Sequence, residues 1–70
     1  MEYRSLGLSV AYFRKLQGMT QQQLADKMEV NYETISRIEN ANTGLTADML
    51  FRLSKALHIS LAELFTHAKL

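Results

Sequence analysis

The sequence marks four helix starts with the same short pattern. In each, a Thr, Asn or Ser stands between two apolar residues that lie five positions apart: Thr20 between Met19 and Leu24, Asn31 between Val30 and Ile35, Thr46 between Leu45 and Leu50, and Ser60 between Ile59 and Leu64. The polar side chain accepts hydrogen bonds from free backbone N–H groups, and the flanking apolar pair packs together across the helix start. Since no segment alternates polar and apolar residues as a strand would, the repeated pattern favours an all-α fold.

Five helices are expected, because residues 5–17 carry an apolar helical stripe of their own and end before Gly18. The expected helices span about residues 5–17, 21–28, 32–40, 47–57 and 61–65. Two of the starts also have the Gln or Glu of a capping box, Gln23 and Glu63. The apolar positions within each segment recur at helical spacing, so each helix presents one stripe to a shared core.

Length and composition limit what such a domain can be. The chain has 70 residues, which is one small domain over residues 1–70. It contains no Cys, which excludes disulfides, Cys-based metal sites and a Cys nucleophile. No apolar run approaches the ~20 residues of a membrane span, so we expect a cytoplasmic protein with no membrane partner. The charges nearly cancel, 8 Lys and Arg against 7 Asp and Glu, and composition alone indicates no polyanionic partner.

No group of residues is typical of an enzyme. Nucleophile–base pairs, metal-ligand sets and Gly-rich phosphate loops are all missing from the sequence. His58 and His67 stand nine residues apart without Cys or paired carboxylates, which is not ligand spacing. A turn role is expected for His58. We therefore expect no catalytic activity, no metal and no other cofactor.

The polar face of the helix expected at residues 32–40 is the informative surface. Only a few residues separate it from the preceding helix, and in such pairs the second helix projects outward. With Ile35 and Ile38 in the core, its outward face and the preceding cap carry six polar or aromatic side chains: Asn31, Tyr32, Glu33, Ser36, Arg37 and Asn40. These can reach bases and phosphates in a DNA major groove, which is wide enough to admit a helix.

The preceding helix opens with Gln21, Gln22 and Gln23 after the Thr20 cap. Free backbone N–H groups at a helix start form a natural phosphate site. Gln side chains add donors there without adding net charge. We expect Gln21 and Gln22 to contact DNA phosphates; the alternative is an ordinary solvated helix start.

Three segments resemble the Cro and phage-repressor type of helix-turn-helix domain, the XRE family. They are FRKLQGMTQQQLA at 13–25, ISRIEN at 35–40 and LFRLSKALHISLAELF at 50–65. The resemblance covers about residues 6–65 of the chain. It implies a lambda-repressor-like fold of five helices, with residues 32–40 as the recognition helix. It also implies a homodimer on a palindromic double-stranded DNA operator.

The resemblance also implies roles for individual residues. The family's base-reading positions match Asn31, Tyr32, Glu33, Ser36 and Arg37. Its first phosphate contact matches Gln21. The segment that clamps the DNA backbone after the recognition helix matches Asn40, Asn42 and Thr43. A buried or half-buried ion pair of relatives matches Arg14 and Glu39.

Two positions depart from the family pattern. Glu29 stands where the turn usually has Gly, and a left-handed backbone there costs a residue with a Cβ about 1 kcal/mol. Leu45 replaces a frequent Pro. Neither change removes a group that contacts DNA.

Several alternatives stay open at this stage. Arg37 could pair with Glu33 four residues earlier instead of reading a base, and Glu33 could simply complement the helix dipole. The apolar residues Phe51, Leu61 and Phe65 could form a dimer contact. They could also serve a protein partner, in which case the domain would be an antitoxin-like interaction module. The leading prediction is a sequence-specific transcriptional regulator, of the repressor type.

Overall fold

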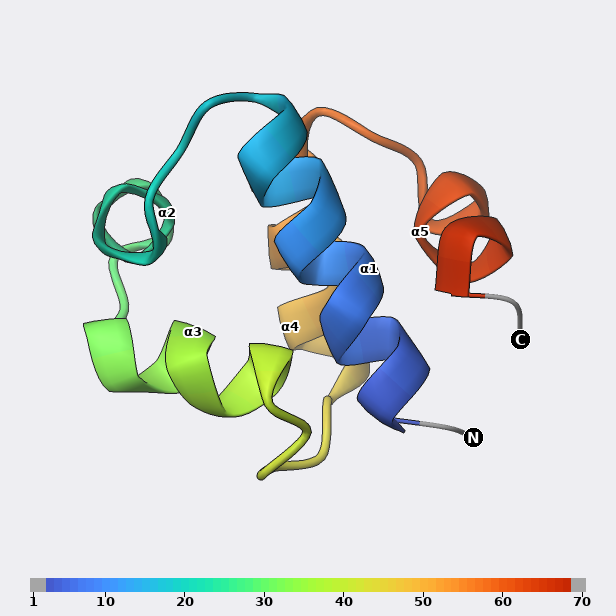
Figure 1. Cartoon of the computed structure of the whole chain (residues 1–70), viewed down its shortest axis with the longest axis horizontal. Helices are drawn as coiled ribbons and strands as arrows, with labels where there is room; N and C mark the ends of the chain where they lie inside the picture. Colours follow the sequence, from blue (N-terminus) through green and yellow to red (C-terminus); the bar gives the residue numbers. More distant parts are fainter. Residues whose placement is uncertain (1–2, 69–70) are drawn as a thin grey trace.

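The computed structural model describes residues 3–68, and within that range every regular element is an α-helix and no strand is present. The helices are α1 (Tyr3–Leu16), α2 (Gln21–Met28), α3 (Tyr32–Glu39), α4 (Ala47–Leu57) and α5 (Leu61–Ala68) (Figure 1). The predicted all-α, five-helix fold is confirmed, with the predicted bounds for α2 and α4. The other boundaries differ slightly: α1 runs from Tyr3 to Leu16, α3 ends one residue early, and α5 continues to Ala68. None of the described helices is both long and apolar enough to cross a membrane.

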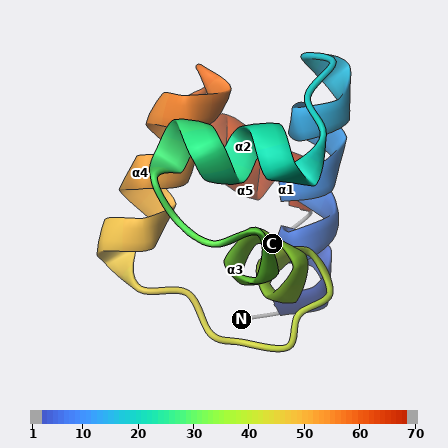
Figure 2. The same ribbon diagram turned by 90° about the vertical axis from the view of Figure 1, so that its left-hand side faces the viewer.

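α1 runs through the middle of the molecule and separates two groups of helices. α2 and α3 lie on one side of it and α5 lies on the other, while α4 passes behind (Figure 1). Seen at right angles, α2 crosses above α3, which points nearly end-on toward the viewer (Figure 2). α2 and α3 therefore form a unit on one flank of the molecule.

All five helices contribute to one core. The buried apolar side chains are Leu6, Val10, Leu24, Ala25, Met28, Ile35, Ile38, Leu53, Ala56, Leu57, Leu64 and Ala68. Burying a Leu or Ile side chain contributes about 1.5–3 kcal/mol, so this cluster is the main source of stability. The members of the predicted hydrophobic staples pack around it or belong to it.

Three of the four predicted N-caps form as expected. Thr20 and Ser60 each make a complete capping box with Gln23 and Glu63, and the Thr46 hydroxyl accepts a hydrogen bond from Met49 N–H at 3.1 Å. These bonds satisfy donors that the helix itself leaves free.

The side-chain cap predicted at Asn31 is wrong. Asn31 has the extended backbone of a cap, but its carboxamide makes no hydrogen bond to the helix. Instead, its backbone carbonyl accepts the Thr34 N–H at 3.0 Å. Since that N–H is the donor that a capping side chain would serve, the Asn31 side chain remains exposed and uncommitted.

Four helices end in a residue with left-handed backbone: Gly18, Glu29, Ala41 and His58. In each case the next residue donates its N–H to the carbonyl five residues earlier, as Val30 does to Ala25 at 3.0 Å. This is the Schellman arrangement. Glu29 therefore keeps the turn between α2 and α3 without the usual Gly, and His58 has the predicted turn role.

Candidate nucleic-acid interface

The exposed face of α3 carries the side chains predicted to read DNA. Ile35 and Ile38 are buried on the opposite face. Asn31, Glu33, Arg37 and Asn40 are exposed, Tyr32 is 42% exposed, and Ser36 lies half-buried at the edge. The structure thus brings all six predicted residues of this segment onto one side of one helix and its start.

Arg37 has an uncommitted guanidinium. Among residues 3–68 it takes part in no hydrogen bond and no ion pair, so the alternative pairing with Glu33 does not form in this structure. An Arg side chain offers five N–H donors in a planar fork. Those donors face solvent from the last turn of α3, where the helix dipole also favours a cation.

The end of α3 is organised by Asn40. Its side-chain nitrogen donates to the Ser36 carbonyl at 2.9 Å and lies 3.4 Å from the Ser36 hydroxyl. The loop that follows is tied back to the helix, because the Asn42 N–H donates to the Arg37 carbonyl at 2.8 Å. Asn42 and Thr43 have exposed side chains beside this end of the helix.

At the start of α2 the two predicted Gln residues behave differently. Gln22 is exposed, and its side-chain nitrogen donates to Asp26 along the same helix at 2.9 Å. Gln21 is half-buried, and its Nε2 donates across to Glu39 Oε1 at 2.9 Å. The backbone N–H groups of both residues have no acceptor in the described chain, so they remain available to an anion.

Arg14 and Glu39 form the ion pair that the family resemblance implies, with side-chain exposures of 9% and 6%. Arg14 Nε lies 2.6 Å from Glu39 Oε2, and its Nη2 lies 3.0 Å from Oε1. The third donor, Nη1, binds the Met19 carbonyl at 2.8 Å. The hydrogen bond with Glu39 raises the pKa of Arg14 above its ordinary value, and the carboxylate charge adds to this against the opposing effect of burial.

The ion pair also joins three helices. Glu39 at the end of α3 receives donors from Arg14 on α1 and from Gln21 at the start of α2. The free N–H groups of α2 and the exposed face of α3 are thereby held in a fixed relation. The Gln21–Glu39 bond was not predicted, because residues 18 positions apart give no periodic signal in the sequence.

The three residues predicted as a dimer contact are not equally accessible. Phe51 is 56% exposed on α4. Leu61 and Phe65 are half-buried on α5, and Phe65 packs against the core. Phe51 is thus the one member of this set with most of its side chain exposed.

The sequence of the chain is similar to those of known DNA-binding proteins. The sequence pattern of the helix-turn-helix family matches residues 10–64. The competence pilus inhibition repressor of Acinetobacter baylyi is 41% identical over 64 residues, which are 91% of this chain and 58% of that protein. The chain therefore spans less than two thirds of that repressor's length.

Solved structures share the arrangement of helices. The clp gene regulator ClgR from Corynebacterium glutamicum superposes with a TM-score of 0.91 at 25% identity, over 96% of this chain and 87% of that one. The restriction-modification controller protein C.Esp1396I superposes with a TM-score of 0.86 at 28% identity, again over 96% and 87% of the two chains.

Proposed function

The chain belongs to the XRE-type helix-turn-helix family of DNA-binding regulators, and on this premise we propose that it is a sequence-specific transcriptional repressor that binds a palindromic double-stranded operator as a dimer. A regulator of this family is not an enzyme. The similar protein of Acinetobacter baylyi is named as a repressor, which supports repression rather than activation. Acting on DNA, the protein would work in the cytoplasm and would need no cofactor.

The observation that carries the proposal is the free guanidinium of Arg37 on the exposed face of α3. An Arg that binds guanine O6 and N7 together is the commonest specific contact in the major groove. Glu33, one turn earlier on the same face, is suited to accept a hydrogen bond from cytosine N4. Asn31, Tyr32 and Ser36 complete the base-reading set.

Phosphate contacts would fix the register of α3 in the groove. The free N–H groups and side chains at Gln21 and Gln22 would take one phosphate group. Asn40, Asn42 and Thr43 would take another beyond the end of α3. Because this set contains no cation, we expect only a shallow dependence of affinity on salt concentration.

Two copies on a palindrome would place their α3 helices in successive major grooves, about 34 Å apart. The apolar residues that could form the dimer contact are Phe51, Leu61 and Phe65, and a protein partner is the alternative use of that patch. The half-buried state of Leu61 and Phe65 leaves Phe51 as the principal apolar group of that surface.

Selection of bound fragments from genomic DNA, followed by footprinting, would identify the operator. On that operator we expect Arg37→Ala to remove discrimination at one base pair in each half-site, worth about 1–3 kcal/mol. Lys55→Ala is the matched control, because it removes an exposed cation from α4 without touching α3.

Comparison of these two variants separates base reading by Arg37 from simple charge attraction. An equal loss of affinity for every sequence in both variants would contradict base reading by Arg37. Failure to retain any duplex at low salt would contradict the proposed function as a whole and would favour the protein-interaction alternative.

A further inference from the structure

Three cationic side chains gather where the end of α2 lies against α4. Lys27 comes from α2, and Arg52 and Lys55 come from α4. Figure 2 shows the end of α2 beside α4, whereas the start of α2 lies beside α1. Between the two helices is a hollow of about 310 Å³, which we call the α2–α4 hollow; it is lined by Lys27, Met28, Glu29, Arg52, Lys55 and Ala56.

The three cations have no anionic partner among residues 3–68. Lys55 takes part in no hydrogen bond and no ion pair, and Lys27 Nζ contacts another nitrogen base, His58 Nε2, at 3.0 Å. Arg52 donates Nη2 to the Met28 carbonyl, and its other N–H groups have no acceptor in the described chain. Since like charges repel one another, an anion that binds between these groups lowers their electrostatic energy.

Glu29 is the only carboxylate in the lining, and it does not neutralise the hollow. Its side chain is exposed and bonds to no other side chain in the described part of the molecule. Three cations against one carboxylate leave an excess of positive charge, although the net charge of the whole chain is only +1. A hollow lined mainly by one sign of charge focuses the electric field and concentrates ions of the opposite sign.

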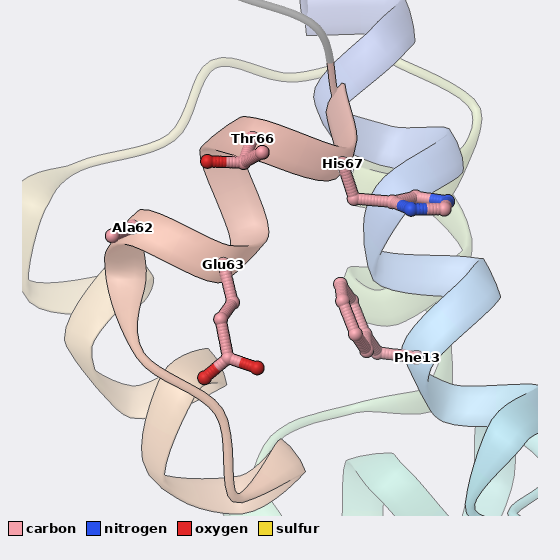
Figure 3. Close-up of a pocket in the computed structure, with 5 residues that line it drawn as sticks. All are labelled: Phe13, Ala62, Glu63, Thr66 and His67. Carbon is pink, nitrogen blue, oxygen red and sulfur yellow. The ribbon is translucent and has the colours of Figure 1, made fainter.

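A larger hollow of the molecule has a different character. It lies between α1 and α5, has a volume of about 590 Å³, and is lined by Phe13, Ala62, Glu63, Thr66 and His67 (Figure 3). Its lining contains a carboxylate and neither Lys nor Arg. Of these two hollows, only the one between α2 and α4 is suited to an anion.

We propose that the α2–α4 hollow binds a small phosphorylated metabolite, whose phosphate group lies between Lys27, Arg52 and Lys55. A Lys ammonium binds phosphate as a point charge, and an Arg guanidinium offers paired N–H donors to its oxygens. Met28 and Ala56, which are 5% and 7% exposed, supply apolar surface for the organic part of the ligand. The volume lies at the lower end of the range of small-molecule sites, about 300–1,000 Å³, which favours a small phosphate monoester.

This site is separate from the proposed DNA contacts. Those contacts use the start of α2, the exposed face of α3 and the loop after it. Lys27 lies about 9 Å along the α2 axis from Gln21. A bound ligand would contact α4 and the end of α2 together, beside the Met28 carbonyl that precedes the turn into α3. The inference goes beyond the proposed function, because ligand binding is measurable without DNA.

Titration with phenyl phosphate, followed by the NMR shifts of the backbone amides, tests the proposal. We expect saturable shifts confined to residues 27–29 and 52–56. Lys27→Gln and Lys55→Gln should each raise the dissociation constant about twofold to fivefold, the range of exposed ion pairs, and the double variant should raise it about tenfold. Arg52 is left in place, because its loss would also release the Met28 carbonyl.

Lys15→Gln is the matched control for these variants. It removes the same charge from an exposed position on α1, so the dissociation constant should not change. Phenol is the control for the probe and should give no saturable shifts at the same concentrations, because it lacks the phosphate group. Since all three lysines are exposed, helix content by circular dichroism should be the same in every variant.

The alternatives give different results. Absence of saturable shifts at millimolar phenyl phosphate would overturn the proposal, as would an equal loss of affinity in Lys15→Gln. Shifts at the amides of Gln21 and Gln22 in place of the hollow would assign the phosphate to the start of α2 and would also overturn it.

A second measurement distinguishes a free ligand from the DNA backbone as the source of the phosphate. Operator affinity should be the same in the wild type and in the Lys27→Gln, Lys55→Gln double variant. A tenfold loss of operator affinity in the double variant would assign the hollow to a DNA phosphate and would overturn the proposal of a metabolite. Saturable binding of phenyl phosphate by a protein that retains no duplex would contradict the proposed function alone.

Discussion

At the scale of single residues, Gly7 determines how closely α1 approaches α3. A Cβ atom at this position would lie 2.5 Å from the Ile38 carbonyl oxygen and 2.7 Å from that of Glu39. Both contacts are with backbone, which cannot move without shifting a whole helix. Gly7→Ala should therefore lower the free energy of unfolding by about 3 kcal/mol, the upper part of the range for overpacking, as measured by urea denaturation.

Gly18→Ala is the control for the Gly7 variant. Gly18 has φ +71° and open space around its Cβ position, so only the left-handed backbone opposes the substitution. We expect a loss of about 1 kcal/mol there. Equal losses at the two positions would show that steric contact with α3 does not matter at Gly7.

At the scale of the helices, the turn between α2 and α3 is formed by a residue poorly suited to it. Glu29 adopts φ 58° at the end of α2, and no other side chain in the described chain bonds to its carboxylate. Glu29→Gly should relieve the strain of the Cβ and raise the free energy of unfolding by about 1 kcal/mol. Thermal denaturation would show this as a higher midpoint.

A glycine placed inside a helix should change the stability in the opposite direction. Lys55→Gly, at an exposed position within α4, should lower stability by about 1 kcal/mol through the poor helix propensity of Gly. A fall in the melting temperature of Glu29→Gly, in parallel with Lys55→Gly, would contradict the account of strain in the turn.

The helix boundaries illustrate what the sequence can and cannot predict. Thr20, Thr46 and Ser60 were predictable, because a capping bond joins residues only three positions apart. The all-α fold followed from the same local signals and from helical periodicity. Asn31 failed as a cap because a backbone carbonyl competes for the same donor, and this depends on the exact path of the turn.

Contacts between distant residues were predictable only where a family resemblance supplied them. The Arg14–Glu39 pair was predicted from that resemblance. The exposed face of α3 was predicted from helical spacing, because placing Ile35 and Ile38 in the core leaves the polar side chains on the opposite face. The close approach at Gly7, the Gln21–Glu39 bond and the left-handed Ala41 had no local pattern. They depend on how whole helices pack, which periodicity does not specify.

At the scale of the whole molecule, one buried ion pair holds α2 and α3, the two helices proposed to face DNA, to the central helix α1. Arg14→Ala removes donors to Glu39 and to the Met19 carbonyl, and leaves a nearly buried carboxylate bound only by Gln21. Breaking one side of such a pair costs about 3–5 kcal/mol, so we expect a loss of that size in urea denaturation at pH 7. The large value follows from leaving Glu39 unpaired rather than from the strength of the pair itself.

The double variant Arg14→Met with Glu39→Leu separates these two effects. It removes both charges together, and apolar replacements of a buried pair are often neutral in stability. We expect it to recover most of the unfolding free energy lost in Arg14→Ala. It should still bind the operator more weakly than the wild type, because Gln21 loses its acceptor and the start of α2 is no longer fixed to α3. A double variant as unstable as Arg14→Ala would show that the pair stabilises the fold directly. Unchanged operator affinity would show that the pair does not position the α2–α3 face that we propose binds DNA.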